Sequence, residues 1–416
     1  MATTTSGTLG ELLKQLYAPW DIEQLLNLTH PVCEELAAKG SAQLGGGGFN
    51  FAVRNRSAEG HGFIGEGDDL PASGSTEVLQ ATVEPKVQVG AVELTGLARS
   101  LSSGNPMAFA RAFEEQIGQT LEGMMADKEA ALFGDGSGTL TSFTSADPAT
   151  SAGPHACVDV GNLREGMSVL FYDSNGANRR SATPSVIKEI DWVAKTVTFD
   201  AAIVAAVAAS DRIVKATPTQ IASASQITTV VPEGLESSLK SSGEYLGINR
   251  ATYPNFKGLN MTASSLFTEE IFTRARTRVT QEGGVSMSAM GDTFRCATHP
   301  NQLDQLFKLA IPRVRYSGGG PFDLGYNEGA ITFGGVTFAT SYLCPTDTAY
   351  IGDFSKSCTL YAPNGELHVD TDYNGSSMKW VDRKDVGLVF AKAYYNFAVK
   401  NPQRFVRITA LTEQTR

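Results

Sequence analysis

The sequence predicts an α+β protein into which a small β-barrel is inserted. Three observations carry this prediction. A single helical segment of roughly 28 residues runs up to a glycine-rich stop at Gly134–Gly138. Segments with the apolar–polar alternation of strands lie before this helix and again near residue 400. Between residues 155 and 217, short β-like runs are separated by turn signals, as in small barrels.

The long helical segment has a clear start and stop. Asn105 and Pro106 supply an N-cap residue and a proline at the first helical position. A helix of roughly 28 residues would be about 42 Å long, too long to be buried fully in a compact domain. We therefore expect a spine that organises other elements. Its core row, at four-residue spacing, would be Phe109, Phe113, Ile117, Leu121 and Met125, with Leu132 completing it.

Composition and charge exclude several classes of protein. A length of 416 residues predicts two or more domains, and the 42% apolar fraction is sufficient for real cores. The net charge of −10 argues against a protein that grips phosphates, because such binding needs clustered Lys and Arg. The longest run of small apolar residues, 201–209, is about half of what a membrane helix requires. We expect a soluble protein without a secretion signal.

Five scattered cysteines predict buried, reduced thiols. Cys33, Cys157, Cys296, Cys344 and Cys358 form no CxxC pair, and their odd number leaves at least one unpaired within the chain. The alternative, a zinc site, would need several ligands at close spacing. Only His155, next to Cys157, approaches that pattern, so we expect no metal.

The N-terminal part reads as an arm followed by an extended hairpin. Short apolar stripes that include Leu12 and Leu16 cannot form a core of their own, and four glycines at 45–48 predict a hinge. Residues 1–48 are therefore assigned as an arm. Residues 49–84 hold two strand-like runs around a long polar tip, and an isolated two-stranded projection is marginal in water. A partner surface would stabilise both appendages.

The remaining segments complete the predicted domain order. Residues 85–150 contain the strand-like run at 87–95 and the spine helix. The barrel insert occupies 155–217, and residues 220–385 mix helices with strands. A long β-rich run at 386–416, interrupted at Asn401-Pro402, returns to the spine.

The motifs of enzymes are missing. The sequence contains no P-loop, GxSxG elbow, HExxH pair or EF-hand loop. Glu66, Asp68 and Asp69 could bind a divalent cation, but a solvated loop tip explains them as well. The Gly134–Gly138 run follows a helix, which favours a C-cap and turn over a phosphate nest. We therefore expect no catalytic residue, no cofactor and no metal ion.

The ordered set of segments resembles the major capsid protein of tailed phages with the Hong Kong 97-like fold. Glu66–Pro71 and then Val92–Thr95 are similar to that family's extended loop and its return strand, and Met107–Gly138 is similar to its spine helix. Gly247–Pro254 and Ala391–Ile408 are similar to later segments. The resemblance covers residues 45 to the C-terminus, and the barrel at 155–217 departs from the minimal fold.

The resemblance implies a subunit that assembles into hexamers and pentamers of an icosahedral shell around double-stranded DNA, without sequence-specific DNA binding. Residues 85–150 would be the peripheral (P) domain and 220–385 the axial (A) domain. Arm and extended loop would lie across neighbouring subunits. The expected inter-subunit contacts are Phe49, Phe51, Arg54, Arg56, Phe63, Ile64, Leu70, Leu12 and Leu16. Expected partners are a portal protein, a separate scaffolding protein and, in some cases, a cement protein.

Some members of that family lock their shells with a Lys–Asn isopeptide bond from a loop lysine. Residues 46–85 contain Arg54 and Arg56 but no Lys, and Lys86 lies at the loop base. We therefore expect no such crosslink. Two other functions stay open: an encapsulin-type cellular compartment, which shares the fold, and more distantly an enzyme with an unrecognised site.

Overall fold

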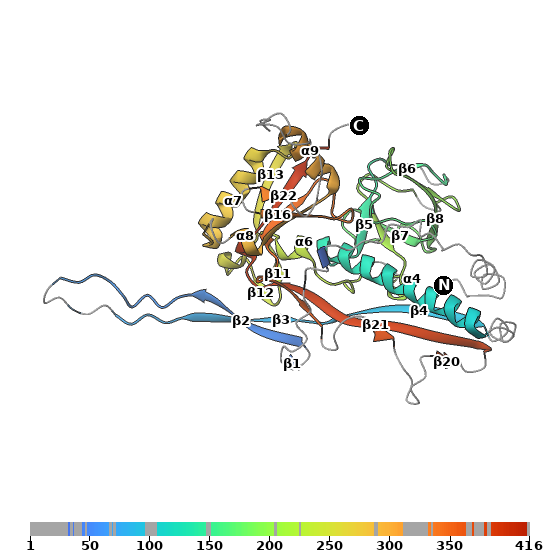
Figure 1. Ribbon diagram of the computed structural model, residues 1–416, viewed down its shortest axis with the longest axis horizontal. Coiled ribbons are helices and arrows are strands. Elements are labelled where there is room, and N and C mark those ends of the chain that lie inside the picture. The colour runs from blue at the N-terminus through green and yellow to red at the C-terminus, as the bar shows by residue number, and fades with distance from the viewer. Residues whose placement is uncertain are drawn as a thin grey trace, which may run out of the picture.

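The computed structural model describes residues 32–33, 36, 44–45, 48–65, 69, 72–95, 106–146, 151–203, 206–223, 226–286, 290–310, 332–333, 336–362, 368–369, 378–380 and 384–413. A body of three sheets carries a long two-stranded projection (Figure 1). The expected contacts Leu12, Leu16 and Leu70, and the acidic residues Glu66 and Asp68, lie outside the described residues.

The projection is the extended hairpin, formed by β2 (Gly48–Arg56) and β3 (Glu77–Val83) with the residues between them. The strands are antiparallel and pair from Phe49↔Val83 outward to Arg56↔Glu77. The glycine run at 45–48 was predicted as a hinge, but its ends are paired: β1 (Leu44–Gly45) is antiparallel to β2, with Gly45 opposite Gly48. Gly48 also lies so close to Val83 that a Cβ atom there would be 2.8 Å from the Val83 carbonyl oxygen.

A second sheet, here called the spine sheet, is built around β21 (Val386–Val399). Strand β4 (Lys86–Thr95) is antiparallel to β21 over ten residue pairs, from Lys86↔Tyr395 to Thr95↔Val386. Strands β18 (Cys358–Tyr361), β19 (His368–Val369) and β20 (Met378–Trp380) also pair with β21. Glu84-Pro85 separates the two sheets, because β3 pairs with β2 and β4 pairs with β21.

The spine helix, α4, spans Pro106–Phe133 as the capping and glycine signals predict. It lies along β4 (Figure 1). Gly90 allows the close approach, since a Cβ atom there would lie 2.6 Å from Met124 Sδ and 2.7 Å from Thr120 Cγ2. Of the predicted row, the side chains of Phe109 and Phe113 lie outside the described residues. Ile117, Leu121 and Met125 are only half-buried; the buried positions are Met124, Ala126, Lys128, Glu129, Ala131, Leu132 and Phe133.

The segment after α4 forms a sheet of six short strands, here called the insert sheet, in the order β5-β10-β7-β8-β9-β6. Its bounds are β5 Thr139–Ser142, β6 His155–Ala156, β7 Ser168–Tyr172, β8 Ser185–Asp191, β9 Thr196–Phe199 and β10 Arg212–Lys215. A bridge between Phe143 and Cys157 joins the ends of β5 and β6, so the two edges of the sheet meet. The first strand lies before residue 155, the boundary that the sequence predicted.

The third sheet, here called the mixed sheet, has the order β13-β22-β17-β14-β16-β15. Its strands are β13 Leu259–Ser265, β14 Phe294–Thr298, β15 Thr332–Phe333, β16 Val336–Thr340, β17 Ala349–Asp353 and β22 Phe405–Leu411. Helices α7 (Glu269–Gly283), α8 (Met290–Thr293) and α9 (Pro300–Ala310) accompany it. Residues 386–416 were expected to return to the spine as one unit. Instead β21 does so, whereas β22 lies inside the mixed sheet, parallel to β13.

The short 3₁₀ turn η6 (Pro402–Arg404) follows Asn401 and separates β21 from β22, so β22 does not continue along the spine sheet. Four residues of β22 are almost fully buried, as expected of an interior strand. Smaller elements join the sheets: α5 (Pro218–Ala222), α6 (Leu235–Ser238), β11 (Glu244–Tyr245), β12 (Ile248–Asn249) and η2 (Pro254–Phe256).

All five cysteines lie among the described residues, and each is buried and free of any disulfide within the chain, as the sequence predicted. Burial raises the pKa of Cys157 and of Cys358 to about 12. None of the described helices combines the length and apolar character that a membrane crossing requires.

Candidate inter-subunit surfaces and the domain junction

The extended hairpin has two different faces, because neighbouring residues of a strand point to opposite sides. One face presents Phe49, Phe51 and Val53, whose burial decreases with distance from the body. The other face exposes Ala52 and Arg54, and the register of the two strands shifts between Arg54 and Arg56. Arg56 lies 4.0 Å from Glu77 on the opposite strand and keeps 73% of its side chain exposed. The hairpin thus has an apolar side formed by Phe49, Phe51 and Val53.

Two of the expected inter-subunit contacts are instead used within the chain. Phe49 is fully buried, and its ring lies 5.1 Å from that of Tyr361. The Phe51 ring stacks on the same tyrosine at 6.3 Å, with the Lys400 ammonium 5.7 Å above it. Phe49 therefore anchors the hairpin to its own body and is unavailable to a neighbour, whereas Phe51 remains half-exposed.

The tip of the hairpin carries two exposed apolar side chains. Phe63 is fully exposed and Ile64 half-exposed, and none of the described residues 57–65 is buried. Exposure of a large aromatic side chain on a projection is unfavourable in water unless another surface covers it. Both residues were expected as contacts, and the structure leaves both of them accessible.

A second accessible apolar surface lies on the spine sheet. Val87 and Val89 of β4 are 58% and 49% exposed, on the strand face opposite to Gly90, which contacts α4. Across the pair with β21 they lie opposite Tyr394 and Lys392, both half-buried. Neither valine was expected at an interface, although their alternation with Gln88 and Gly90 was the available signal.

The insert sheet is tied to the spine helix and to the mixed sheet through ion pairs. Asp127 of α4 lies 2.5 Å from Lys215 Nζ and 3.3 Å from Arg164 Nη2. Lys195, in the turn between β8 and β9, lies 2.7 Å from Glu413, just after β22. These pairs join segments up to 218 residues apart, and the sequence offered no local signal for them.

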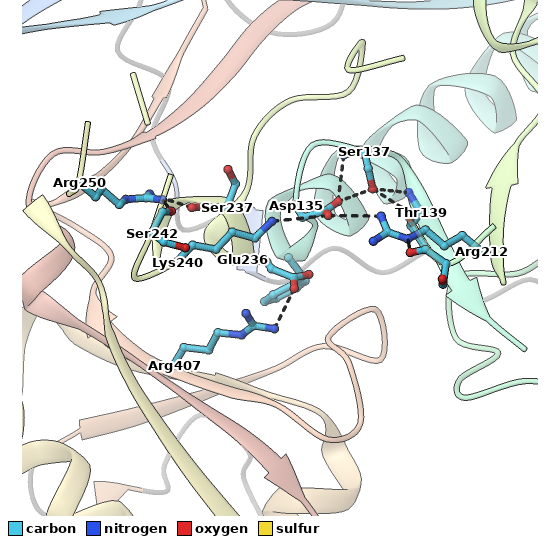
Figure 2. A network of polar contacts seen from close by, with 12 residues as sticks. Asp135, Ser137, Thr139, Arg212, Glu236, Ser237, Lys240, Ser242, Arg250 and Arg407 are labelled. Atoms are coloured by element: carbon cyan, nitrogen blue, oxygen red, sulfur yellow. Dashed lines mark hydrogen bonds and ion pairs between the residues drawn. The ribbon is translucent and has the colours of Figure 1, made fainter. Parts of the chain in front are cut away.

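A polar network at the end of the spine helix joins three parts of the fold (Figure 2). Asp135 accepts hydrogen bonds from the backbone N–H and the hydroxyl of Ser137. Its other carboxylate oxygen lies 3.7 Å from Lys240 Nζ, after α6, and 3.9 Å from Arg212 Nη1, in β10. The Gly134–Gly138 run is thus a turn after a helix, and its aspartate links that helix to the insert and to α6.

The polar network around Asp135 extends to helix α6 and from there to the mixed sheet. Glu236 in α6 accepts a hydrogen bond of 2.9 Å from Arg407 in β22, which connects α6 to the mixed sheet. Arg250 donates from Nη2 to the carbonyl oxygens of Ser237 and Ser238, both at 2.8 Å. Figure 2 shows Arg250 and Arg407 reaching this short helix from different sides, and Lys240 extending from its end toward Asp135.

The pKa of Asp135 makes this junction sensitive to acid. Burial raises the pKa of its carboxyl, but the hydrogen bonds from Ser137 and the nearby Lys240 and Arg212 outweigh burial and lower it below 3.8. A carboxyl whose pKa is lowered by folding stabilises the folded state above its unfolded pKa. That stabilisation is lost as the pH falls from 3.8 through the folded value.

We therefore predict that Asp135→Asn destabilises the protein at neutral pH by about 1 kcal/mol. The difference in unfolding free energy between wild type and Asp135→Asn should shrink as the pH falls below the unfolded pKa. Urea unfolding curves at a series of pH values measure it. A difference that stays constant down to the lowest pH at which both proteins fold would contradict the assigned ion pairs.

The N-terminal segment is held by a buried carboxylate. Glu129 of the spine helix is fully buried and accepts hydrogen bonds from the Cys33 backbone N–H, at 3.3 Å, and from the Ser341 hydroxyl. Val32, Cys33 and Leu36 belong to the same apolar cluster as Leu132 and Phe133. This anchor was not anticipated from the sequence, because an isolated Glu in a helix resembles a solvated one.

Among the residues that the structure describes, no group of three or more His, Cys, Asp or Glu side chains could hold a metal ion. Asp69, the described member of the predicted acidic cluster, is exposed. The surfaces described above are the extended hairpin and the exposed face of the spine sheet, and the polar network at α6 links three parts of the fold.

Comparison with known proteins identifies the fold. No protein-family model and no curated protein matches the sequence. The structure matches the capsid asymmetric unit of cyanophage A-1(L) with a TM-score of 0.55 and 12% identity, over 96% of this chain and 98% of that chain. It matches the capsid of a native GTA particle with a TM-score of 0.50 and 11% identity, over 96% of each chain.

An encapsulin complex from Synechococcus elongatus gives a TM-score of 0.47 and 11% identity, over 100% of this chain and 99% of that chain. Identities of 11–12% show the fold alone. The two capsid matches each cover 96% of this chain. The chain therefore has the α+β Hong Kong 97-like fold of capsid proteins.

Proposed function

We propose that this chain is the major capsid protein of a tailed double-stranded DNA phage, and that it assembles into hexamers and pentamers of an icosahedral shell. The observation that carries the proposal is the extended hairpin, on a fold shared with capsid proteins along almost its full length. A projection that exposes Phe63 and Ile64 far from any core is explained by a neighbouring subunit that covers it.

The surfaces of the chain suit head-to-tail contacts between copies. The hairpin offers an apolar stripe that ends in Val53 and Leu79, and the spine sheet offers Val87 and Val89 on its exposed face. These surfaces differ from each other, so contact between them is heterologous. Such contacts close into rings when the rotation between subunits is a simple fraction of a turn.

Residues 139–216 form an inserted β-barrel domain, which the meeting of strands β5 and β6 supports. The barrel is held on the body by the Asp127 and Glu413 ion pairs.

A separate scaffolding protein directs assembly, a portal protein occupies one vertex, and a cement protein is an optional addition. The DNA is enclosed without sequence-specific binding, consistent with the net charge of −10.

Electron microscopy of the purified chain tests the proposal. Wild type is expected to form rings or closed shells, whereas Phe63→Ser/Ile64→Ser should stay as folded small oligomers. Ile221→Ser serves as the control, because it removes an exposed apolar side chain outside the hairpin. Small oligomers of wild type under all assembly conditions, or normal shells from the hairpin variant, would contradict the proposed role.

The same preparations separate the remaining alternatives. Uniform closed shells of native size from the chain alone would argue against a separate scaffolding protein. A portal at one vertex and packaged DNA in native particles would distinguish a phage capsid from an encapsulin-type compartment. Small oligomers with a turnover activity would favour an enzyme.

We further predict that the shell is not crosslinked through its hairpin. Residues 46–85 contain no Lys, and Lys86, at the base of the hairpin, has only 23% of its side chain exposed, near Glu84. Denaturing gel electrophoresis of mature particles should therefore show a band at the size of a single 44.2 kDa chain. A ladder of multiples would overturn the prediction of a shell without such crosslinks.

A further inference from the structure

The segment at 244–256 contacts the base of the extended hairpin at two separate places. The Leu246 carbonyl oxygen accepts a hydrogen bond of 3.1 Å from the Thr82 N–H in β3. The Asn255 side chain donates to the backbone carbonyl of Asn55 in β2, at 3.2 Å. Thr82 lies opposite Asn50, so the contacts are five residues apart, about 16 Å along the hairpin. Two contacts this far apart fix a direction as well as a position.

The contacting surface of this segment has a defined shape. Leu246 and Gly247 both have positive φ, 52° and 80°, and they close the two-residue turn between β11 and β12. Tyr245, Leu246, Ile248 and Phe256 pack in one cluster with the buried hairpin residues Phe49, Ala81 and Val83. Residues 244–256 are called the cradle below, because they support the hairpin along one side.

Arg250 fixes the cradle to the junction described above. It is 1% exposed, and its guanidinium donates to the carbonyl oxygens of Ser237, Ser238 and Ser242 at 2.8–3.2 Å. The same group lies 4.9 Å from the centre of the Tyr245 ring. Only the planar guanidinium of Arg can donate to three such oxygens while it stacks on a ring. One side chain therefore joins α6 to the cradle.

We propose that Arg250 sets the direction of the extended hairpin by coupling the cradle to α6. Helix α6 is bound in turn to the mixed sheet through Glu236–Arg407 and to the end of the spine helix through Lys240–Asp135. The hairpin, which extends far from the body (Figure 1), consequently follows the relative position of the mixed sheet and the spine helix. The coupling is a property of the single chain and does not depend on the proposed shell.

Spin-label distance measurements on the full, unassembled chain test this coupling. Labels are attached through unnatural amino acids at the exposed positions Ala58, on the hairpin, and Arg274, on α7. Wild type should give a narrow distance distribution. Arg250→Lys and Arg250→Gln should broaden it, and hydrogen exchange of the Thr82 amide should become about tenfold faster.

Arg180→Gln is the matched control, because Arg180 also forms a multiply hydrogen-bonded pair, with buried Asp211, but lies in the insert. It should leave both readouts unchanged. A folded Arg250→Gln with a wild-type distribution would overturn the proposal, as would equal broadening in Arg180→Gln. If the Arg250 variants do not fold, Asn255→Ala serves as the test. The exposed Asn255 side chain makes only the contact with Asn55, the one farther from the body. An unchanged distance distribution in Asn255→Ala would overturn the role of the cradle.

Discussion

Replacing Gly234 by alanine is expected to destabilise the protein by about 3 kcal/mol. Gly234 precedes α6 and packs against the last turn of the spine helix, where a Cβ atom would overlap the carbonyl oxygens of Ala131 and Leu132. These obstacles are backbone atoms, and Leu132 is fully buried, so the helix end cannot move aside without disrupting its core. Denaturant unfolding of the purified chain measures the effect.

Gly118→Ala is the matched control for this prediction. Gly118 lies inside the spine helix with no atom within 4 Å of the position that a Cβ would take. Alanine is favoured over glycine in a helix interior by about 1 kcal/mol, so this variant should be more stable than wild type. If both variants had the same stability, the close contact between α6 and the spine helix would be wrong.

Glu129→Ala is the second substitution with a large expected effect, a loss of about 3 kcal/mol. It removes a buried acceptor from both the Cys33 N–H and the Ser341 hydroxyl and leaves a cavity beside them. Because Cys33 belongs to the N-terminal segment, the loss should also make that segment accessible. Hydrogen exchange at the Cys33 amide and denaturant unfolding measure the two effects.

Glu122→Ala tests whether the loss of stability in Glu129→Ala is caused by the burial of Glu129. Glu122 lies two turns earlier in the same helix and is exposed, so its replacement should change the unfolding free energy by no more than about 0.5 kcal/mol. A comparable loss in both variants would assign the effect to helix propensity or to overall charge. Protection of the Cys33 amide in Glu129→Ala would show that the N-terminal segment is held by its apolar contacts alone.

Local signals account for the parts of the fold that the sequence predicted well. The bounds of the spine helix follow from Pro106 at its start and the glycines after Phe133, and both are effects within one turn of the chain. The hairpin follows from strand alternation around a polar tip. Neither prediction required knowledge of residues distant in the sequence.

Long-range pairing accounts for what could not be predicted. Nothing local to β22 indicates that it lies parallel to β13, some 150 residues earlier, and apart from its neighbour β21. Ile117, Leu121 and Met125 of the predicted helix row are only half-buried, because burial depends on where β4 and Gly90 lie. Phe49 was expected at an interface for the same kind of reason: alternation shows which residues share a face but not which surface covers it.

The pairing of β4 with β21 also has a consequence for the time at which the chain can fold. About 300 residues separate the two strands, so a ribosome that adds roughly 5–20 residues per second completes β21 some 15–60 s after β4. Until then the spine sheet lacks its central strand, and the mixed sheet lacks β22. Nascent chains on one messenger should therefore be unable to associate through finished surfaces, which delays contact between copies until synthesis of each is nearly complete.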